Sequence, residues 1–229
     1  MVLSRTPLFN DANLVSYWPF EGNSTDIKSG NNGTDTTITY GNVNGKYAQG
    51  AGFNGTSSYI AIADHASLRI TGALSIVGWV FPSDTTPNKE MVLFAKGDQG
   101  SAANLDYTLT LQARKIRAIV SNGVVTNDLG NGSVMTNLVY HHVAMVYVPS
   151  TSLTLYLDGV QDTQSTTSII AAIQSTTHAC AIGRDGTSAS NFLGTKLDDE
   201  AIFTRALTPT EIKMLARPPA GGSFLNNFL

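Results

Sequence analysis

The chain has 229 residues, of which 42% are hydrophobic and 14% are charged, and its formal net charge at pH 7 is −3. The charged fraction lies below the ~25% of ordinary soluble domains, and no basic run is present, which argues against a nucleic acid or an anionic membrane as partner. The single Cys180 excludes an intrachain disulfide. No run of about 18 apolar residues indicates a transmembrane helix.

The N-terminal residues 1–12 form a polar arm with a small apolar pair, Leu8 and Phe9. This arm lacks the apolar core of a secretion signal. The sequence therefore predicts either that a signal has been removed or that the protein leaves the cell by another route. Residues 21–35, which follow the first apolar run, are of turn-forming types throughout.

Short apolar runs separated by tight turns make up most of the chain, with turn pairs such as Asn54-Gly55, Asn122-Gly123 and Asp158-Gly159 between them. Several runs alternate between apolar and polar side chains, as antiparallel strands do. We predict strands at residues 14–20, 48–53, 58–63, 74–81, 91–95, 107–112, 116–121, 140–148, 153–157, 179–183 and 196–204. The pattern predicts an all-β fold, a two-sheet antiparallel sandwich or jelly roll.

One short helix is predicted near the C-terminus, at residues 208–216. Thr208 can serve as its N-cap, Pro209 suits the first helical position, and Glu211 can complete a capping box. This helix directly follows the last predicted strand, so the sequence places one helix after an otherwise all-β domain.

Three consecutive acids, Asp198, Asp199 and Glu200, lie in the last predicted strand. Because successive side chains of a strand point to opposite faces, we expect Asp198 and Glu200 on one face and Asp199 on the other. Carboxylates on both faces of a sheet need water, a partner or a cation.

The chain changes character after Arg217, where the sequence reads PPAGGSFLNNFL. Pro218 and Pro219 cannot continue the helix, and two glycines then allow a bend. Four apolar side chains follow: Phe224, Leu225, Phe228 and Leu229. Because exposed apolar side chains need a partner surface, we predict that this tail docks either onto its own domain or into a neighbouring subunit.

Seven motifs stand in order along the chain: LVSYWPFEGNSTDIKSGNNGT, GAGFNGTSSYIAI, ALSIVGWVFP, LFAKGD, YHHVAMVYVPSTSLTLYLDGV, AIGRDG and KLDDEAIFTRALTPTEI. This succession resembles the concanavalin A-like domains of laminin-G type, a jelly-roll family. The resemblance implies two curved antiparallel sheets packed face to face, with the last strand beside the first. We therefore expect an arm at residues 1–12, one β-sandwich domain at 13–216 and a docking tail at 217–229.

A structural calcium ion is the cofactor that the resemblance implies. Members of the wider superfamily hold it between the first strand, a Phe-Asn-Gly turn and the late acidic strand, and the matching positions here are Glu21, Gly55 and Asp198. Calcium takes about six to eight oxygen ligands, which carboxylates and backbone carbonyls supply. The alternative is that Asp198 accepts backbone N–H groups of a turn.

The sequence does not predict an enzyme. Laminarinase-type hydrolases of the superfamily carry two glutamates and an aspartate alternating along one strand, with two carboxyl groups about 5–5.5 Å apart. No Glu-x-Asp-x-Glu array occurs in this chain. His141 and His142 cannot bind one metal ion together, because adjacent strand residues face opposite sides. A glycoside hydrolase is thus the weakest alternative.

Candidate glycan-binding residues lie in polar loops and on two strands. They are Asp98, Asn104, Asp106, Tyr107, Tyr156 and Arg184. Tyr156 lies opposite the leucine face of its strand, so we expect it to be exposed. Trp18 and Trp79 have apolar neighbours in their strands, which favours a core position for both.

These features favour a non-catalytic surface, adhesion or assembly module, although a fold alone does not fix a function. A phage decoration or tail-fibre-type protein fits the lack of a signal and the apolar arms at both ends. Its partners would be a capsid or tail scaffold, further copies of the chain, or cell-surface glycans. The expected location is the virion surface or the extracellular space. The alternative is a carbohydrate-binding module of a secreted protein, which strong saturable binding on a glycan array would identify.

Overall fold

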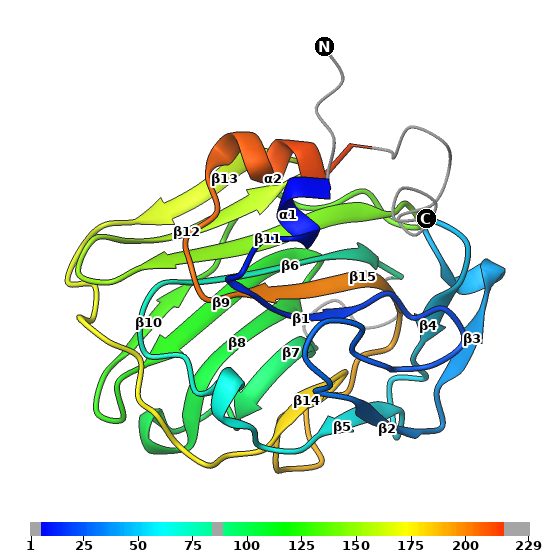
Figure 1. The fold of residues 1–229 in the computed structure, drawn as a ribbon, viewed down its shortest axis with the longest axis horizontal. Coiled ribbons are helices and arrows are strands. Elements are labelled where there is room, and N and C mark those ends of the chain that lie inside the picture. The colour runs from blue at the N-terminus through cyan, green and yellow to red at the C-terminus, as the bar shows by residue number, and fades with distance from the viewer. Residues whose placement is uncertain (1–5, 84–88, 218–229) are drawn as a thin grey trace.

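The computed structural model describes residues 6–83 and 89–217, and these fold into two antiparallel sheets packed face to face (Figure 1). Within these residues sheet A has eight strands. In spatial order they are β13 (Val160–Ser165), β12 (Ser152–Leu157), β11 (His141–Val148), β6 (Leu74–Phe81), β15 (Lys196–Phe203), β4 (Gly50–Gly52) and β3 (Thr39–Gly41), with β1 (Leu14–Trp18) paired to β15. The last strand therefore lies beside the first, as the sequence predicted.

Sheet B has seven strands in the described part of the chain. In spatial order they are β10 (Thr126–Leu129), β9 (Lys115–Ser121), β8 (Leu105–Gln112), β7 (Glu90–Gly97), β14 (Cys180–Ile182), β5 (Tyr59–Ile62) and β2 (Gly33–Thr36). The predicted two-sheet jelly-roll sandwich is confirmed. The short strands β2, β3, β10 and β13 were not predicted.

The helices are few and short in the described residues. They are α1 (Thr6–Phe9), α2 (Pro209–Leu215) and the 3₁₀ turns η1 (Asn42–Asn44), η2 (Ala66–Leu68) and η3 (Ala102–Asn104). The predicted capping box is present, since Thr208 and Glu211 bond each other's backbone N–H groups at the start of α2. No helix within residues 6–83 and 89–217 is long and apolar enough to cross a membrane.

The main core lies between the two sheets and follows the alternation of the strands. In β12, Leu153 and Leu155 face this core and are fully buried. Trp18 stacks on Phe94 with ring centroids 5.9 Å apart, which confirms its core position. Cys180 is also buried here, and burial raises the pKa of its thiol to about 12. It packs as a small hydrophobic side chain rather than as a reactive thiol.

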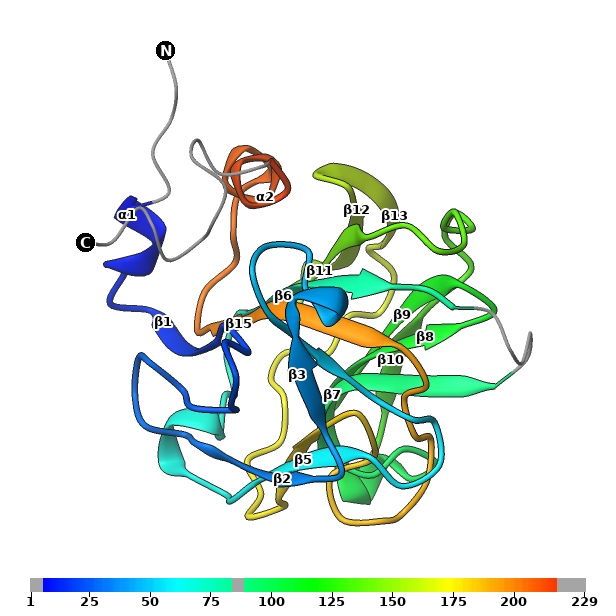
Figure 2. The same ribbon diagram turned by 90° about the vertical axis from the view of Figure 1, so that its right-hand side faces the viewer.

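A second apolar cluster covers the opposite face of sheet A. Figures 1 and 2 show α1 and α2 on this outer face, away from sheet B. Side chains of both helices and of sheet A pack there, among them Leu8, Tyr17, Val77, Phe203 and Ile212. The two helices therefore give sheet A a buried outer face, whereas an open sandwich would leave it to solvent.

One side chain ties the N-terminal segment to α2. Arg205 donates from Nε to Asp11 at 2.6 Å and from Nη2 and Nη1 to the two carboxylate oxygens of Glu211 at 2.7 and 2.9 Å. This bidentate geometry fixes the position of both segments. The predicted docking residues Phe224, Leu225, Phe228 and Leu229 lie outside the described residues.

Candidate ligand-binding surfaces

The acidic segment of β15 contains a β-bulge that changes the direction of its side chains. Asp198 pairs with Trp79 and Ala201 pairs with Val77, so β15 has one residue more than β6 over this stretch. Asp199 takes the extra position with a φ of +53°. The expected alternation of the three acids is therefore wrong from Asp199 onward.

Asp198 and Asp199 both lie on the outer face of sheet A. The Asp198 Oδ2 atom accepts N–H groups of Lys46 and Tyr47 at 2.8 and 2.9 Å. Asp199 accepts a short hydrogen bond from the hydroxyl of Tyr17. Burial and the neighbouring charge of Asp199 raise the pKa of Asp198 to about 9.

Glu200 points the other way, into the main core. It is 3% exposed and lies in a space lined by Gly78, Leu93, Leu109 and Val143. Neither of its carboxyl oxygens has a hydrogen-bond partner among the described residues. Burial raises its pKa well above the ordinary value. The expectation that Asp198 and Glu200 share one face is thus wrong.

The three residues nominated for calcium all have partners within the protein. Glu21 accepts the N–H of Gln49 at 3.2 Å, so Glu21 and Asp198 both hold the segment from Lys46 to Gln49. The Gly55 carbonyl instead accepts the Lys89 ammonium at 2.5 Å, and a bound ammonium does not fit a cation site. No group of three acidic, His or Cys side chains in residues 6–83 and 89–217 is arranged to hold a metal.

Calcium binding at Glu21 and Asp198 stays a prediction from the sequence. Melting temperatures can test it, and the contacts in the structure argue against an effect of the ion. Because Asp198 already accepts two N–H groups and its pKa is about 9, we expect equal melting temperatures in millimolar Ca²⁺ and in EDTA at neutral pH. A rise in Ca²⁺ that Asp198→Asn abolishes, and that the remote Asp64→Asn retains, would instead establish the ion.

Three of the candidate ligand-binding side chains are buried, and their assignment is wrong. Asp106 is fully buried and accepts the Thr176 hydroxyl at 2.7 Å. Tyr107 faces the main core and donates to the Leu68 carbonyl at 2.7 Å. Tyr156 does lie opposite the leucine face of β12, but it is only 5% exposed because it belongs to the cluster beneath α2.

Two of the other candidates, Asp98 and Asn104, meet at one end of sheet B, where two loops are joined. Asp98 accepts N–H groups of Thr187 and Ser188 at 2.7 and 3.0 Å, and its own N–H donates to the Asn104 carbonyl at 2.8 Å. Burial raises the pKa of Asp98, but these hydrogen bonds outweigh it and the net pKa is lowered. Asp98 thus holds the loops together, and its carboxylate is already engaged.

Arg184 follows β14 and packs on an aromatic side chain. Its guanidinium carbon is 3.8 Å from the centre of the Tyr59 ring, and Phe192 follows with ring centroids 6.4 Å from Tyr59. All three side chains are half-buried. The stacking is a cation–π contact that fixes the arginine in place.

A large polar groove lies elsewhere on sheet B, over the β8–β9 turn, β9 and the end of β10. It encloses about 570 Å³. Its lining residues are Gln112, Ala113, Lys115, Ile116, Arg117, Asp128, Gly130 and Asn131. None of these was nominated from the sequence.

Arg117 is the central side chain of this groove. Its Nη1 atom donates to both oxygens of Glu90 at 2.6 and 2.7 Å, and its Nε and Nη2 atoms donate to Asp128 at 2.8 and 2.5 Å. The Thr110 hydroxyl donates to Glu90 at 3.0 Å. The hydrogen bonds that Arg117 donates to Asp128 above all raise the pKa of Arg117. The result is a fixed row of carboxylate, guanidinium and carboxylate, half-exposed to solvent.

Two carboxyl groups of β15 with raised pKa values are buried rather than open to solvent. Asp198 and Glu200, whose pKa values are raised, are 1% and 3% exposed. His141 is bound to Asp158 at 2.7 Å between its Nδ1 atom and the carboxylate, and it pairs with Val80 while His142 pairs with Trp79. The two histidines thus lie on opposite faces of the strand, as their spacing predicted. Their contacts are those of residues that stabilise the fold.

Comparison with known proteins agrees with this fold. A laminin-G-type family model, described as the Concanavalin A-like lectin/glucanases superfamily, matches residues 54–213. The chain belongs to this superfamily. No curated protein sequence matches the chain significantly.

Solved structures of the concanavalin A-like fold match most of the chain at low identity. The binding domain of Paraclostridial Mosquitocidal Protein 1 has a TM-score of 0.72 at 18% identity, covering 89% of this chain and 52% of its own. The binding domain of botulinum neurotoxin serotype G has a TM-score of 0.67 at 14% identity, covering 89% of this chain and 50% of its own. The chain thus spans about half the length of these toxin domains.

A third structure matches over its whole length. Domain 4 of an extracellular GH43 arabinanase from Geobacillus stearothermophilus, solved in complex with arabinotriose, has a TM-score of 0.67 at 22% identity. The match covers 91% of this chain and 100% of that domain. At these identities the likeness establishes the fold, and the site must be argued from this chain's own residues.

Proposed function

We propose that this chain is a non-catalytic glycan-binding module and that the groove around Arg117 is its binding site. The observation that carries the proposal is the Arg117–Asp128 ion pair in the wall of a groove of about 570 Å³, with Arg117 also held by Glu90. Neighbouring sugar hydroxyls need a donor and an acceptor side by side, and a guanidinium held between two carboxylates offers both.

The groove is also built on rigid elements. The lining residues Arg117 and Asp128 stand on the paired strands β9 and β10. Glu90, which holds Arg117, and Thr110, which donates to Glu90, stand on the paired strands β7 and β8. Side chains fixed on strands and locked by mutual hydrogen bonds lose little freedom when a ligand binds. Gln112 and Asn131 are exposed at the rim, where they add further amide donors and acceptors.

Structural relatives support the same class of function. The matching arabinanase domain was solved with an oligosaccharide, and the matching toxin domains are binding domains. A role on a virion surface and a role as a module of a secreted protein both stay predictions from the sequence. Each of them would use a glycan-binding site of this kind.

Arg117→Ala is expected to weaken glycan binding at least tenfold. The reason is that a hydrogen bond to a charged group contributes about 1.5–3 kcal/mol, and about 1.4 kcal/mol corresponds to a factor of ten. The measurement is a glycan array with the intact chain, followed by titration calorimetry with the best ligand and with arabino-oligosaccharides.

Arg69→Ala is the matched control, because Arg69 is also ion-paired, with Asp64, but lies outside the groove. Gln112→Ala tests the rim with no effect on an ion pair. The groove is excluded if both groove variants bind as tightly as the unmodified chain. Failure of the unmodified chain to bind any glycan would refute the proposed function itself.

A further inference from the structure

Five Asn-Gly pairs occur along the chain, at residues 32–33, 44–45, 54–55, 122–123 and 131–132. In such a pair the backbone nitrogen of the glycine can attack the side-chain amide of the asparagine, because a residue without a Cβ leaves room for the ring to close. Asparagine is one of the thermolabile residues of proteins. The reaction is fast only where both groups are free to turn toward each other.

In three of the pairs a hydrogen bond holds the glycine N–H. The distance from the nitrogen to its acceptor is 2.9 Å for Gly33, 2.8 Å for Gly55 and 3.0 Å for Gly123. The acceptors are two backbone carbonyls and one hydroxyl, of Ser24, Leu193 and Ser121 respectively. Each of these nitrogens must therefore break a hydrogen bond before it can react.

Two of the same pairs also have a locked asparagine side chain. The Oδ1 atom of Asn54 accepts the three N–H groups of residues 56–58 at 2.9 to 3.0 Å. The Oδ1 atom of Asn122 accepts the N–H groups of Val124 and Val125 at 3.0 and 2.7 Å. Asn122 is exposed to solvent, yet neither its side-chain amide nor the glycine that follows it is free to move.

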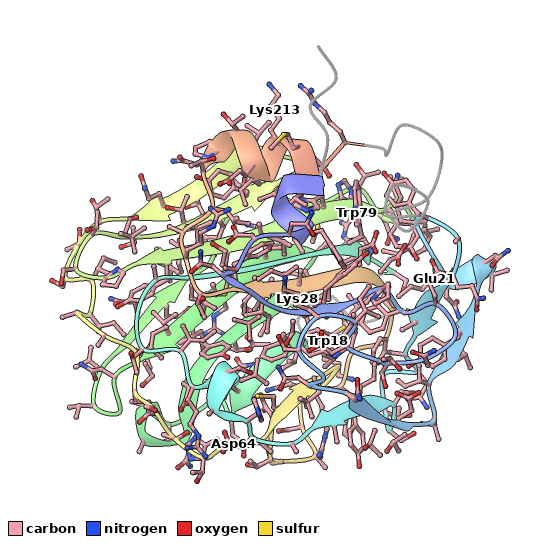
Figure 3. The ribbon with its side chains drawn as sticks, in the orientation of Figure 1. Trp18, Glu21, Lys28, Asp64, Trp79 and Lys213 are labelled. Atoms are coloured by element: carbon pink, nitrogen blue, oxygen red, sulfur yellow. The ribbon has the colours of Figure 1, made fainter. Side chains whose placement is uncertain are left out.

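The pair formed by Asn44 and Gly45 is enclosed. Asn44 is 9% exposed, and its Nδ2 atom donates to the Thr39 carbonyl at 2.9 Å. The segment that follows is fixed as well, because Glu21, which Figure 3 labels near β4, accepts the N–H of Gln49 at 3.2 Å. The fold therefore protects this pair too.

Asn131 and Gly132 differ from the other four pairs. Asn131 is exposed and lines the groove around Arg117. Within residues 6–83 and 89–217, nothing accepts the Gly132 N–H, and the Asn131 side chain makes no hydrogen bond. The loop is anchored at the next residue, since the Asp162 carboxylate accepts the Ser133 N–H at 3.0 Å. The two reacting groups can thus meet without opening the fold.

We propose that Asn131 is a site of spontaneous deamidation and that its products weaken ligand binding in the groove. The Gly132 nitrogen loses its proton and forms a bond to the Cγ atom of Asn131. The bond from Cγ to Nδ2 breaks, so ammonia leaves with that proton and a succinimide ring remains. Water then opens the ring at one of its two carbonyl groups, which gives aspartate or isoaspartate. No electron is transferred in either step.

The effect on the groove rests on the proposed glycan-binding function. The amide of Asn131 offers a sugar hydroxyl both a donor and an acceptor, whereas a carboxylate only accepts. The new charge also enters a groove that already contains the Asp128 carboxylate. We expect the deamidated chain to bind glycan about fivefold more weakly, which corresponds to the loss of one ordinary hydrogen bond.

Peptide mapping by mass spectrometry tests the modification itself. The full chain is incubated in mildly alkaline water labelled with heavy oxygen and then digested in ordinary water, so that label marks the side chains that lost ammonia during the incubation. Asn122 is the internal control, because it belongs to the same kind of pair and is also exposed. We expect label at Asn131 at least about tenfold faster than at Asn122, a factor that corresponds to about 1.4 kcal/mol in the barrier.

The same incubation in urea shows whether the fold causes the difference. Once the chain is unfolded, no pair is held, and the rates at Asn131 and Asn122 should converge. Equal rates in the folded chain would overturn the proposal. A ratio that urea leaves unchanged would also overturn it, because the cause would then be the local sequence.

Titration calorimetry separates the modification from the proposed function. The probe is an arabino-oligosaccharide, or the glycan that binds most tightly on the array. We expect weaker binding by the incubated chain and by Asn131→Asp, and unchanged binding by the control Asn122→Asp. Equal affinity of the fresh and the incubated chain would overturn the effect on binding. If the fresh chain binds no glycan, the proposed function fails, whereas fast labelling at Asn131 would still establish the modification.

Discussion

Glu200→Gln is expected to raise the free energy of unfolding at neutral pH, because the buried glutamate must keep a proton that it loses in the unfolded chain, whereas glutamine has no proton to keep. Glu200 is 3% exposed, lies against Gly78 in the main core, and has no hydrogen-bond partner among the described residues. The substitution keeps the shape of the side chain and removes its ability to ionise. Glu200→Met, which also removes the polar atoms, is expected to stabilise at least as much.

The gain from Glu200→Gln should depend on pH in a defined direction. Burial raises the pKa of Glu200 above its ordinary value of 4.5, so the folded chain retains this proton at pH values where the unfolded chain has lost it. The unmodified chain therefore has its full stability below pH 4.5 and loses stability as the pH rises toward the folded pKa. The difference between variant and unmodified chain is thus smallest in acid and grows toward neutral pH.

Urea unfolding between pH 4 and 8 measures this difference, and Glu211→Gln serves as a control of opposite sign. Hydrogen bonds from Arg205 above all lower the pKa of Glu211, although burial opposes them. Glu211→Gln should therefore destabilise at neutral pH, and its effect should disappear as the pH falls below the ordinary pKa. Parallel stability profiles for Glu200→Gln and the unmodified chain would contradict the assigned core position of an ionisable Glu200.

The acidic strand also shows what the sequence can and cannot predict about side-chain direction. Strict alternation predicts that Asp198 and Glu200 share a face, and it holds for Leu153 and Leu155 in β12, where the pairing is regular on the β11 side. It fails in β15 because the bulge at Asp199 inserts one residue. A non-glycine residue with positive φ leaves no local signal in a run of three acids.

The exposure of a strand residue is also hard to predict from the sequence, because an element that is distant along the chain can cover it. The direction of Tyr156 follows from the pattern of β12, but its burial depends on α2, which is far away in sequence and packs on the outer face of sheet A. The assignment of Tyr156 as an exposed sugar platform fails for that reason. The core positions of Trp18 and Cys180 could be predicted, because the apolar neighbours in their strands and the alternation of side chains both indicated burial.

The candidate groove was missed because its residues meet through sheet pairing. Glu90, Arg117 and Asp128 lie on three strands, and β10, which carries Asp128, was not predicted at all. A weak signal did exist. Lys115 and Arg117 alternate with Ile116 and Ala118 in a chain that has only 14% charged residues, which places two cations on the outer face of β9.

Gly97→Ala is expected to be the most damaging small substitution in the loops around Asp98. Gly97 has a φ of +82°, and an added Cβ would lie 2.1 Å from the Asn104 carbonyl oxygen. The residue also joins two loops, since its N–H donates to Ala179 at 3.0 Å and its carbonyl accepts from Gly186 at 2.9 Å. Because backbone must move to relieve the contact, we expect a loss of more than about 3 kcal/mol in the free energy of unfolding.

Gly100→Ala separates the two causes of this loss. Gly100 lies in the same loop with a φ of +95°, but an added Cβ would meet nothing within 4 Å. Its substitution should therefore cost only the conformational strain of about 1–2 kcal/mol. Urea unfolding of both variants gives the comparison. Equal losses would mean that strain alone sets the cost and that the close approach of Gly97 to Asn104 does not hold the β7–β8 loop in place.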